Sequence, residues 1–217
     1  MPFTLDDFKE LLKPGLRKED FRVFVFGPYL LPSDTVDAPG VAAELHEEVV
    51  SHAKYLRYAT RKALEQKGFT VDFGETREVL EFWESHFGSP DPGTSEELQA
   101  QLLCGAVVMY PSSVGSICEL GMFARQKKIA EKMLAIVHTR YEHDKSFFRE
   151  GLLEVFQQEN GRVRFVDYSK HEACIEAAIR FVSGAYSSVN RQIMTCNEID
   201  VRNRGTFVEK FLKPSTY

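Results

Sequence analysis

The stretch that decides the fold reads Ala106-Val107-Val108-Met109-Tyr110-Pro111-Ser112-Ser113-Val114-Gly115-Ser116-Ile117-Cys118-Glu119-Leu120-Gly121. Its first five residues are apolar or aromatic throughout, which predicts a strand buried on both faces of a parallel sheet. The proline and serines that follow predict a loop, and the pattern from residue 116 to about 129 predicts a helix. A buried strand, a loop and a helix in succession are typical of α/β proteins.

The same alternation continues on both sides of this stretch. Further strands are expected over residues 22–26, 69–73, 133–138 and 163–166. Helices are expected over residues 3–19, 41–67, 146–157 and 171–185, and from a Thr94-x-x-Glu97 capping box to about Leu103. The pattern therefore predicts a doubly wound, Rossmann or flavodoxin-like parallel sheet of about five strands, ordered 2-1-3-4-5, with helices on both faces.

Length and composition set the limits of the chain. Its 217 residues predict an amino-terminal helix (1–20), one α/β domain (21–187) and a carboxy-terminal extension (188–217). Hydrophobic residues make up 43%, which excludes a disordered protein, and the net charge of −5 argues against a general nucleic-acid binder. We expect a cytoplasmic protein, because the acidic start is unlike a signal peptide and no stretch predicts a membrane span.

The cysteines follow no metal-binding spacing. Four are present without a C-x-x-C pair, so we expect no metal and no disulfide, only reduced and buried thiols: Cys104, Cys118, Cys174 and Cys196.

The predicted strand order reverses between the first and third strands. Ligands of doubly wound folds bind at such a switch point, outside the carboxyl ends of the strands. Two loops would face each other there, namely Gly27-Pro28-Tyr29 and the segment from Ser112 to Glu119. The strand order alone thus predicts a pocket between these two loops.

The start of the helix after the third strand has two interpretations. Gly115-Ser116 would place unpaired N–H groups, with serine hydroxyls nearby, where a phosphate could bind. The alternative is an ordinary strand-to-helix turn, since the segment matches neither the Walker pattern nor G-x-G-x-x-G.

Glu119 also has two interpretations. Ser116-x-x-Glu119 has the spacing of a capping box, in which the glutamate only returns a hydrogen bond to the helix start. The functional interpretation is a carboxylate in the switch-point crevice, which would stabilise or attack an oxocarbenium-like sugar.

Two segments carry a family resemblance. The run from Val23 to Tyr29 resembles the first strand and Gly-Pro loop of nucleoside 2-deoxyribosyltransferases, and Ser113 to Gly121 is similar to the segment that holds their catalytic glutamate. Deoxynucleoside-monophosphate N-glycosidases share this pattern, and TIR-domain NAD hydrolases place a glutamate comparably. Similar domains are toxins of bacterial anti-phage systems, including retrons.

The resemblance implies a role for each matching position. Glu119 would be the nucleophile or oxocarbenium stabiliser. Gly27, Pro28 and Tyr29 would form the nucleoside side of the site, and Ser113, Gly115 and Ser116 the phosphate or ribose side. Two departures favour hydrolysis over base transfer. Cys104-Gly105 stands where these enzymes commonly have an Asp, and no segment matches the carboxy-terminal group that the transferases take from a neighbouring subunit.

The function implied is an N-glycosidase that hydrolyses the base–sugar bond of a deoxynucleoside monophosphate or NAD, as an anti-phage toxin. We expect the protein to form a homo-oligomer and to need no cofactor. Its expected partner is a regulatory protein or a nucleic acid, and no membrane association is expected. The alternatives are a non-catalytic module that senses a nucleotide in the same crevice, and an interaction protein with a purely structural core.

Several other side chains have a functional and a structural interpretation. Tyr29 and Trp83 would stack on a base or lie in the core, and Arg57 and Arg61 would bind phosphate or face solvent. His138, at a strand end, would be an acid or a structural histidine. The remaining acidic candidates sit on the crevice rim or on a solvated loop: Glu75, Asp34 and Asp37.

Overall fold

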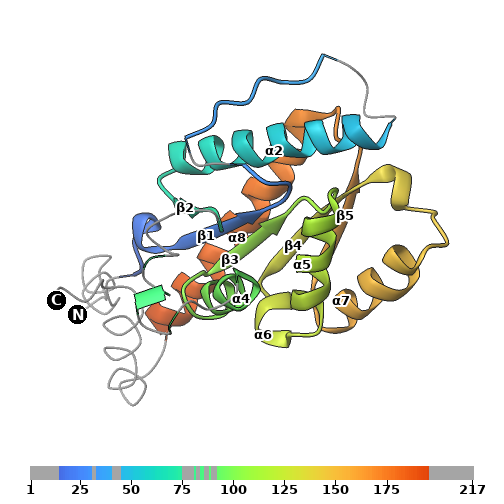
Figure 1. Ribbon diagram of the computed structural model, residues 1–217. Coiled ribbons are helices and arrows are strands. Elements are labelled where there is room, and N and C mark those ends of the chain that lie inside the picture. Colours follow the sequence, from blue (N-terminus) through green and yellow to red (C-terminus); the bar gives the residue numbers. More distant parts are fainter. Residues whose placement is uncertain are drawn as a thin grey trace, which may run out of the picture.

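The computed structural model describes residues 15–30, 33–40, 45–74, 81, 84–85, 88 and 92–195. It contains a five-stranded sheet in the order β2-β1-β3-β4-β5, in which every pairing is parallel (Figure 1). The strands are β1 (Arg22–Phe26), β2 (Thr70–Asp72), β3 (Ala106–Met109), β4 (Met133–His138) and β5 (Arg162–Val166). The predicted doubly wound fold and its strand order are confirmed.

Helices cover both faces of the sheet (Figure 1). One face packs against α2 (His46–Gln66) and α8 (His171–Thr195). The other face packs against α4 (Pro92–Leu102), α5 (Val114–Ala124), α6 (Lys127–Ala130), the π-helix η3 (Phe147–Leu153) and α7 (Glu154–Gln158). The described residues also include two short 3₁₀ turns, η1 (Lys18–Asp20) and η2 (Thr139–Tyr141).

The strand sequences explain this two-sided core. Successive side chains of a strand point to opposite faces of the sheet. Val23 and Val25 therefore join the core under α2 and α8, whereas Phe24 and Phe26 join the core on the other face. All four are buried, as expected for a central strand of a parallel sheet.

Several helix boundaries differ from the predicted ones. Because α4 begins at Pro92, Thr94 lies inside the helix and the predicted capping box is wrong. The helix predicted over 116–129 begins earlier, at Val114, and is divided into α5 and α6. The helix predicted over 146–157 begins as the π-helix η3, and α8 runs to Thr195, past the expected domain end at 187. Residues 3–14 of the first predicted helix lie outside the described residues, and 15–17 are not helical.

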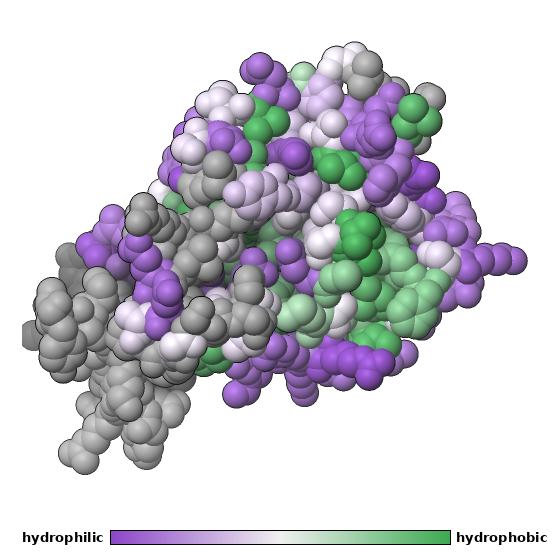
Figure 2. Space-filling model, viewed as in Figure 1, coloured by the Kyte–Doolittle hydropathy of each residue, from purple (hydrophilic) through white to green (hydrophobic). Residues whose placement is uncertain are grey.

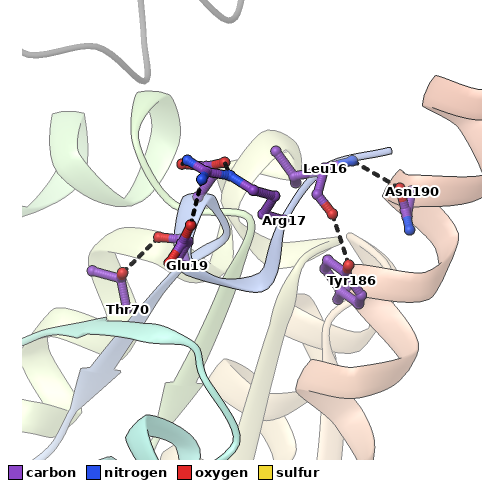
Figure 3. A network of polar contacts seen from close by, with 7 residues as sticks. Leu16, Arg17, Glu19, Thr70, Tyr186 and Asn190 are labelled. Atoms are coloured by element: carbon purple, nitrogen blue, oxygen red, sulfur yellow. Dashed lines mark hydrogen bonds and ion pairs between the residues drawn. The ribbon is translucent and has the colours of Figure 1, made fainter. Parts of the chain in front are cut away.

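The long α8 is tied to the segment that precedes β1 (Figure 3). The backbone N–H of Leu16 donates to Oδ1 of Asn190 at 2.9 Å, and the hydroxyl of Tyr186 donates to the carbonyl of Leu16 at 2.7 Å. The Thr70 hydroxyl donates to the carbonyl of Glu19 at 2.6 Å, which adds β2 to the network. Contacts between residues about 170 positions apart thus hold the end of α8.

Among the helices of the described ranges, none is both long and apolar enough to cross a bilayer.

Candidate functional site

The carboxyl ends of β1 and β3 lie side by side, as the predicted switch point requires. The N–H of Tyr110 donates to the carbonyl of Phe26 at 3.1 Å, and a Cβ placed on Gly27 would lie 3.4 Å from the carbonyl oxygen of Tyr110. The Gly27-Pro28-Tyr29 loop and the β3–α5 loop therefore leave the sheet from adjacent strands. The first loop turns toward α2 and the second toward α5, on opposite faces.

A buried arginine supports the first of these loops. Arg57 of α2 is 1% exposed, and its guanidinium donates to the carbonyls of Val25 at 2.9 Å and Pro28 at 3.0 Å. The same group lies 4.4 Å from the ring centroid of Phe73. The interpretation of Arg57 as a solvent-facing residue is therefore wrong, and these bonds give its guanidinium a structural role. Helical spacing from Ala53 and Leu56 places Arg57 on the buried face of α2, and this spacing was the sequence signal for its burial.

The residues of this loop differ in exposure. Gly27 and Pro28 are buried, so their backbone shapes the loop without offering side chains to a ligand. Tyr29 is 65% exposed, so its interpretation as a core aromatic is wrong. An exposed ring beside the switch point is available for stacking.

The β3–α5 loop closes through two serines. Ser113 is the N-cap of α5, and its Oγ accepts the N–H of Ser116 at 3.2 Å. The Ser116 Oγ accepts the N–H groups of Ser112 and Ser113, both at 3.0 Å, and donates to the carbonyl of Ser113 at 3.0 Å. The buried Ser116 hydroxyl is thus engaged within the loop, while Val114 and Gly115 are exposed at the helix start.

Glu119 has no part in this cap. The capping box joins Ser113 to Ser116, so the predicted Ser116–Glu119 box is wrong. The reason is that α5 begins at Val114, two residues earlier than the sequence pattern indicates, which moves Ser116 from the cap into the first turn. Glu119 therefore lies in the second turn, half-buried, with its Oε2 shielded from solvent.

An apolar hollow of about 360 Å³ lies on the other flank of α5. Figure 2 shows the apolar surface around it, over α5 and η3. Gly121, in its wall, is about 200° around the helix from Glu119. The hollow is therefore separate from the expected crevice, and Phe147 at its rim, 83% exposed, was not singled out from the sequence.

His138 is a buried histidine with structural contacts. It is 6% exposed, its Nδ1 accepts the N–H of Arg140 at 3.2 Å, and its Nε2 lies 3.7 Å from Oδ1 of Asp167. Burial lowers the pKa of His138, which the nearby Asp167 carboxylate opposes. A buried imidazole that is neutral at physiological pH fits a structural role better than an acid.

A second histidine contact, which sequence reasoning missed, joins α2 to α8. Nδ1 of His52 and Nε2 of His171 are 2.8 Å apart, and the ring of Tyr55 lies 4.6 Å from that of His171. Burial and the neighbouring His52 lower the pKa of His171. The position of His52 beside Val49 on the buried face of α2 was the sequence signal for this contact.

The remaining predicted residues do not gather into a site. Asp34 is half-buried and Asp37 exposed, while Glu75, Trp83 and Cys196 fall outside the described residues. Cys104 and Cys174 are buried as expected, but Cys118 is exposed, so its prediction as a buried thiol is wrong. Over the part of the chain that the structure describes, no three metal-ligating side chains form a group.

A family comparison matches residues 53–211, nearly three quarters of the chain, to the STM3845 retron effector protein family. The chain belongs to this family. The STM3845 match includes α4, β3 and α5 with Glu119, and it begins after the Gly27-Pro28-Tyr29 loop. Membership supports the expected role of a retron-type anti-phage effector, while the likeness to nucleoside deoxyribosyltransferases stays a resemblance. A search of curated proteins finds no match.

Proposed function

We propose that this retron effector is an N-glycosidase that hydrolyses the base–sugar bond of a nucleotide, a deoxynucleoside monophosphate or NAD. The observation that carries the proposal is the position of Glu119. Its carboxylate is half-buried in the second turn of α5, and the helix start is capped without it. A partly buried carboxylate in the helix that follows the switch-point loop is a good candidate for chemistry.

The proposed reaction needs one carboxylate and one water. The C–N bond to the base breaks, and its electron pair leaves with the base. A base that leaves a deoxynucleoside monophosphate takes up a proton, whereas the cationic nicotinamide of NAD leaves as the neutral molecule without one. Glu119 stabilises the positive charge that develops on the sugar, either electrostatically or through a covalent ester. Water then adds to the anomeric carbon and releases a proton, so the products are free base and sugar phosphate, or nicotinamide and ADP-ribose.

The neighbouring residues fit the other parts of a nucleotide. The exposed residues Val114 and Gly115 are at the amino end of α5, where the helix N–H groups and its positive dipole suit a phosphate or ribose oxygen. The exposed ring of Tyr29 suits a base. Water is the proposed acceptor, because Cys104-Gly105 and the missing carboxy-terminal segment depart from the transferase pattern.

The test is the substitution Glu119→Gln, measured against wild type for base release. The protein is incubated under multiple turnover with deoxynucleoside monophosphates, ribonucleoside monophosphates and NAD, and free base is followed by chromatography. Turnover should fall by at least about 100-fold, as when an electrostatic stabiliser of a transition state is removed. The melting temperature should change little, since the Ser113–Ser116 cap stays intact.

The matched control is Glu154→Gln, which neutralises an exposed glutamate on α7 and should leave turnover unchanged. Because a retron partner can hold an effector inactive, the purified protein is assayed both alone and in its native lysate. Wild-type turnover in Glu119→Gln would refute the catalytic assignment. Nucleotide binding without base release in either setting would favour the sensing module instead.

A further inference from the structure

A buried glutamine in α4 has no hydrogen-bond partner. Gln99 is 1% exposed, and neither Oε1 nor Nε2 of its amide makes a hydrogen bond within the described part of the chain. An amide left in this state inside a protein destabilises the fold, because it has exchanged its bonds to water for none. Such a group is retained where it serves a ligand or an ordered water.

Gln99 lies in the same layer of the fold as Glu119. Its neighbour Ala100 belongs to the core between the sheet and α4–α7, and so does Leu120, the neighbour of Glu119. The helices α4 and α5 pack against each other. Gln99 and Glu119 therefore come from adjacent helices on one face of the sheet.

Both residues lie partway along helices that run from the carboxyl edge of the sheet toward its amino edge. The beginning of α4 is at the carboxyl edge, because Glu96 in its second turn would meet a Cβ placed on Gly74, just after β2. The last turn is at the amino edge, where Nζ of Lys132, just before β4, donates to the carbonyl of Gln101 at 3.0 Å. Measured along the helix axis, Gln99 lies about 10 Å from the first residue of α4, and Glu119 lies about 8 Å from the first residue of α5.

We propose that Gln99 is a ligand-binding residue of the Glu119 site, and that its amide recognises a nucleobase edge. This inference rests on the proposed function for the identity of the ligand. A primary amide offers a donor beside an acceptor, and it pairs with a ligand that presents the complementary acceptor and donor. The edges of nucleobases carry such adjacent groups, as the pairing of Gln and Asn with adenine illustrates. Ser95, one turn earlier on α4 and 3% exposed, places a hydroxyl on the same helix face.

The experiment measures binding and stability in one set of variants. Gln99→Met removes the amide at nearly constant volume and is made in the Glu119→Gln background, so that no ligand is consumed. Calorimetry with the four deoxynucleoside monophosphates, the four ribonucleoside monophosphates and NAD identifies the tightest binder of the parent. Its affinity should fall at least about tenfold in Gln99→Met, the loss expected for a buried hydrogen-bonded pair.

Stability supplies the second readout. The melting temperature should stay the same or rise, because the substitution removes a buried amide that no protein group satisfies. Gln101→Met is the matched control, since it removes the same amide from a half-buried site on the same helix and should preserve affinity.

Unchanged affinity in Gln99→Met, or a parent that binds none of these nucleotides, would overturn the inference. Failure of the proposed function has a different signature. In that case wild type releases no base, whereas the nucleotide still binds and the binding still depends on Gln99.

Discussion

The two serines that close the β3–α5 loop should differ in their contribution to stability. Ser116→Ala removes the acceptor for the N–H groups of Ser112 and Ser113 and a donor to the Ser113 carbonyl. Ser113→Ala removes the N-cap acceptor for the N–H of Ser116. The pair thus compares a hydroxyl that joins three backbone groups with one that serves as an ordinary cap.

The magnitudes follow from burial. Ser112 is fully buried, so its N–H has no water to turn to once the Ser116 hydroxyl is gone, whereas Ser113 is half-buried. A buried backbone donor without an acceptor costs about 1–3 kcal/mol of folding free energy. Because the two bonds to the N–H and carbonyl of Ser113 are lost as well, Ser116→Ala should cost about 2–4 kcal/mol. Ser113→Ala should cost about 1 kcal/mol, the usual loss for an N-cap.

Urea unfolding of the three proteins, followed by circular dichroism, measures both differences. In thermal unfolding, 1 kcal/mol corresponds to about 2–4 °C for a chain of this length. Ser116→Ala should therefore melt below Ser113→Ala by several degrees. If the two variants lose equal stability, or if Ser113→Ala loses more, then the hydrogen bonds of the Ser116 hydroxyl do not hold the loop.

Two further predictions concern the face covered by α2 and α8. Arg57→Met should destabilise the protein by about 2–4 kcal/mol, because the carbonyls of Val25 and Pro28 lose a buried charged donor. Arg57→Lys should recover part of the lost stability in the same urea titration. An Arg57→Met protein as stable as wild type would contradict the structural role of Arg57. The pKa of His171 lies below its ordinary value of 6.5, so the unfolded chain binds protons at a higher pH than the native one, and stability should be lost as the pH falls below 6.5. His171→Leu should weaken the pH dependence of the melting temperature between pH 7.5 and 5, whereas substitution of the exposed His143 by Leu should not. The same pH dependence in both variants would refute the assignment to His171.

Much of the fold could be read from the sequence, because hydrophobic period and turn residues are local properties. The apolar run at residues 106–110 predicted a buried strand, and the β-branched and aromatic run at 22–26 predicted a strand; both are strands of the sheet. The right-handed crossover rule then restricted the strand order, which the structure confirms. From that order followed the adjacency of the loops after β1 and β3.

Helix starts were less predictable, since a capping pattern states only which residues are able to cap. Ser113 and Ser116 both precede helical sequence, and the choice between them depends on which hydroxyl reaches which backbone N–H. The interpretation of Glu119 changed with that choice. From the sequence it was either a capping residue or a chemical one, and the geometry of the loop removes the first option.

Only the tertiary structure decided what the buried polar side chains contact. Helical spacing places Arg57 and His52 on the apolar face of α2 but does not say what they bind, and a glutamine such as Gln99 also fits a solvated position on a helix. Their burial results from how α2, α4 and α8 lie on the sheet, through contacts between residues far apart in the chain. Sequence therefore determined the sheet, its order and the place of the switch point. The environment of each candidate residue there was decided by packing, because burial is a property of the assembled layers and not of any segment.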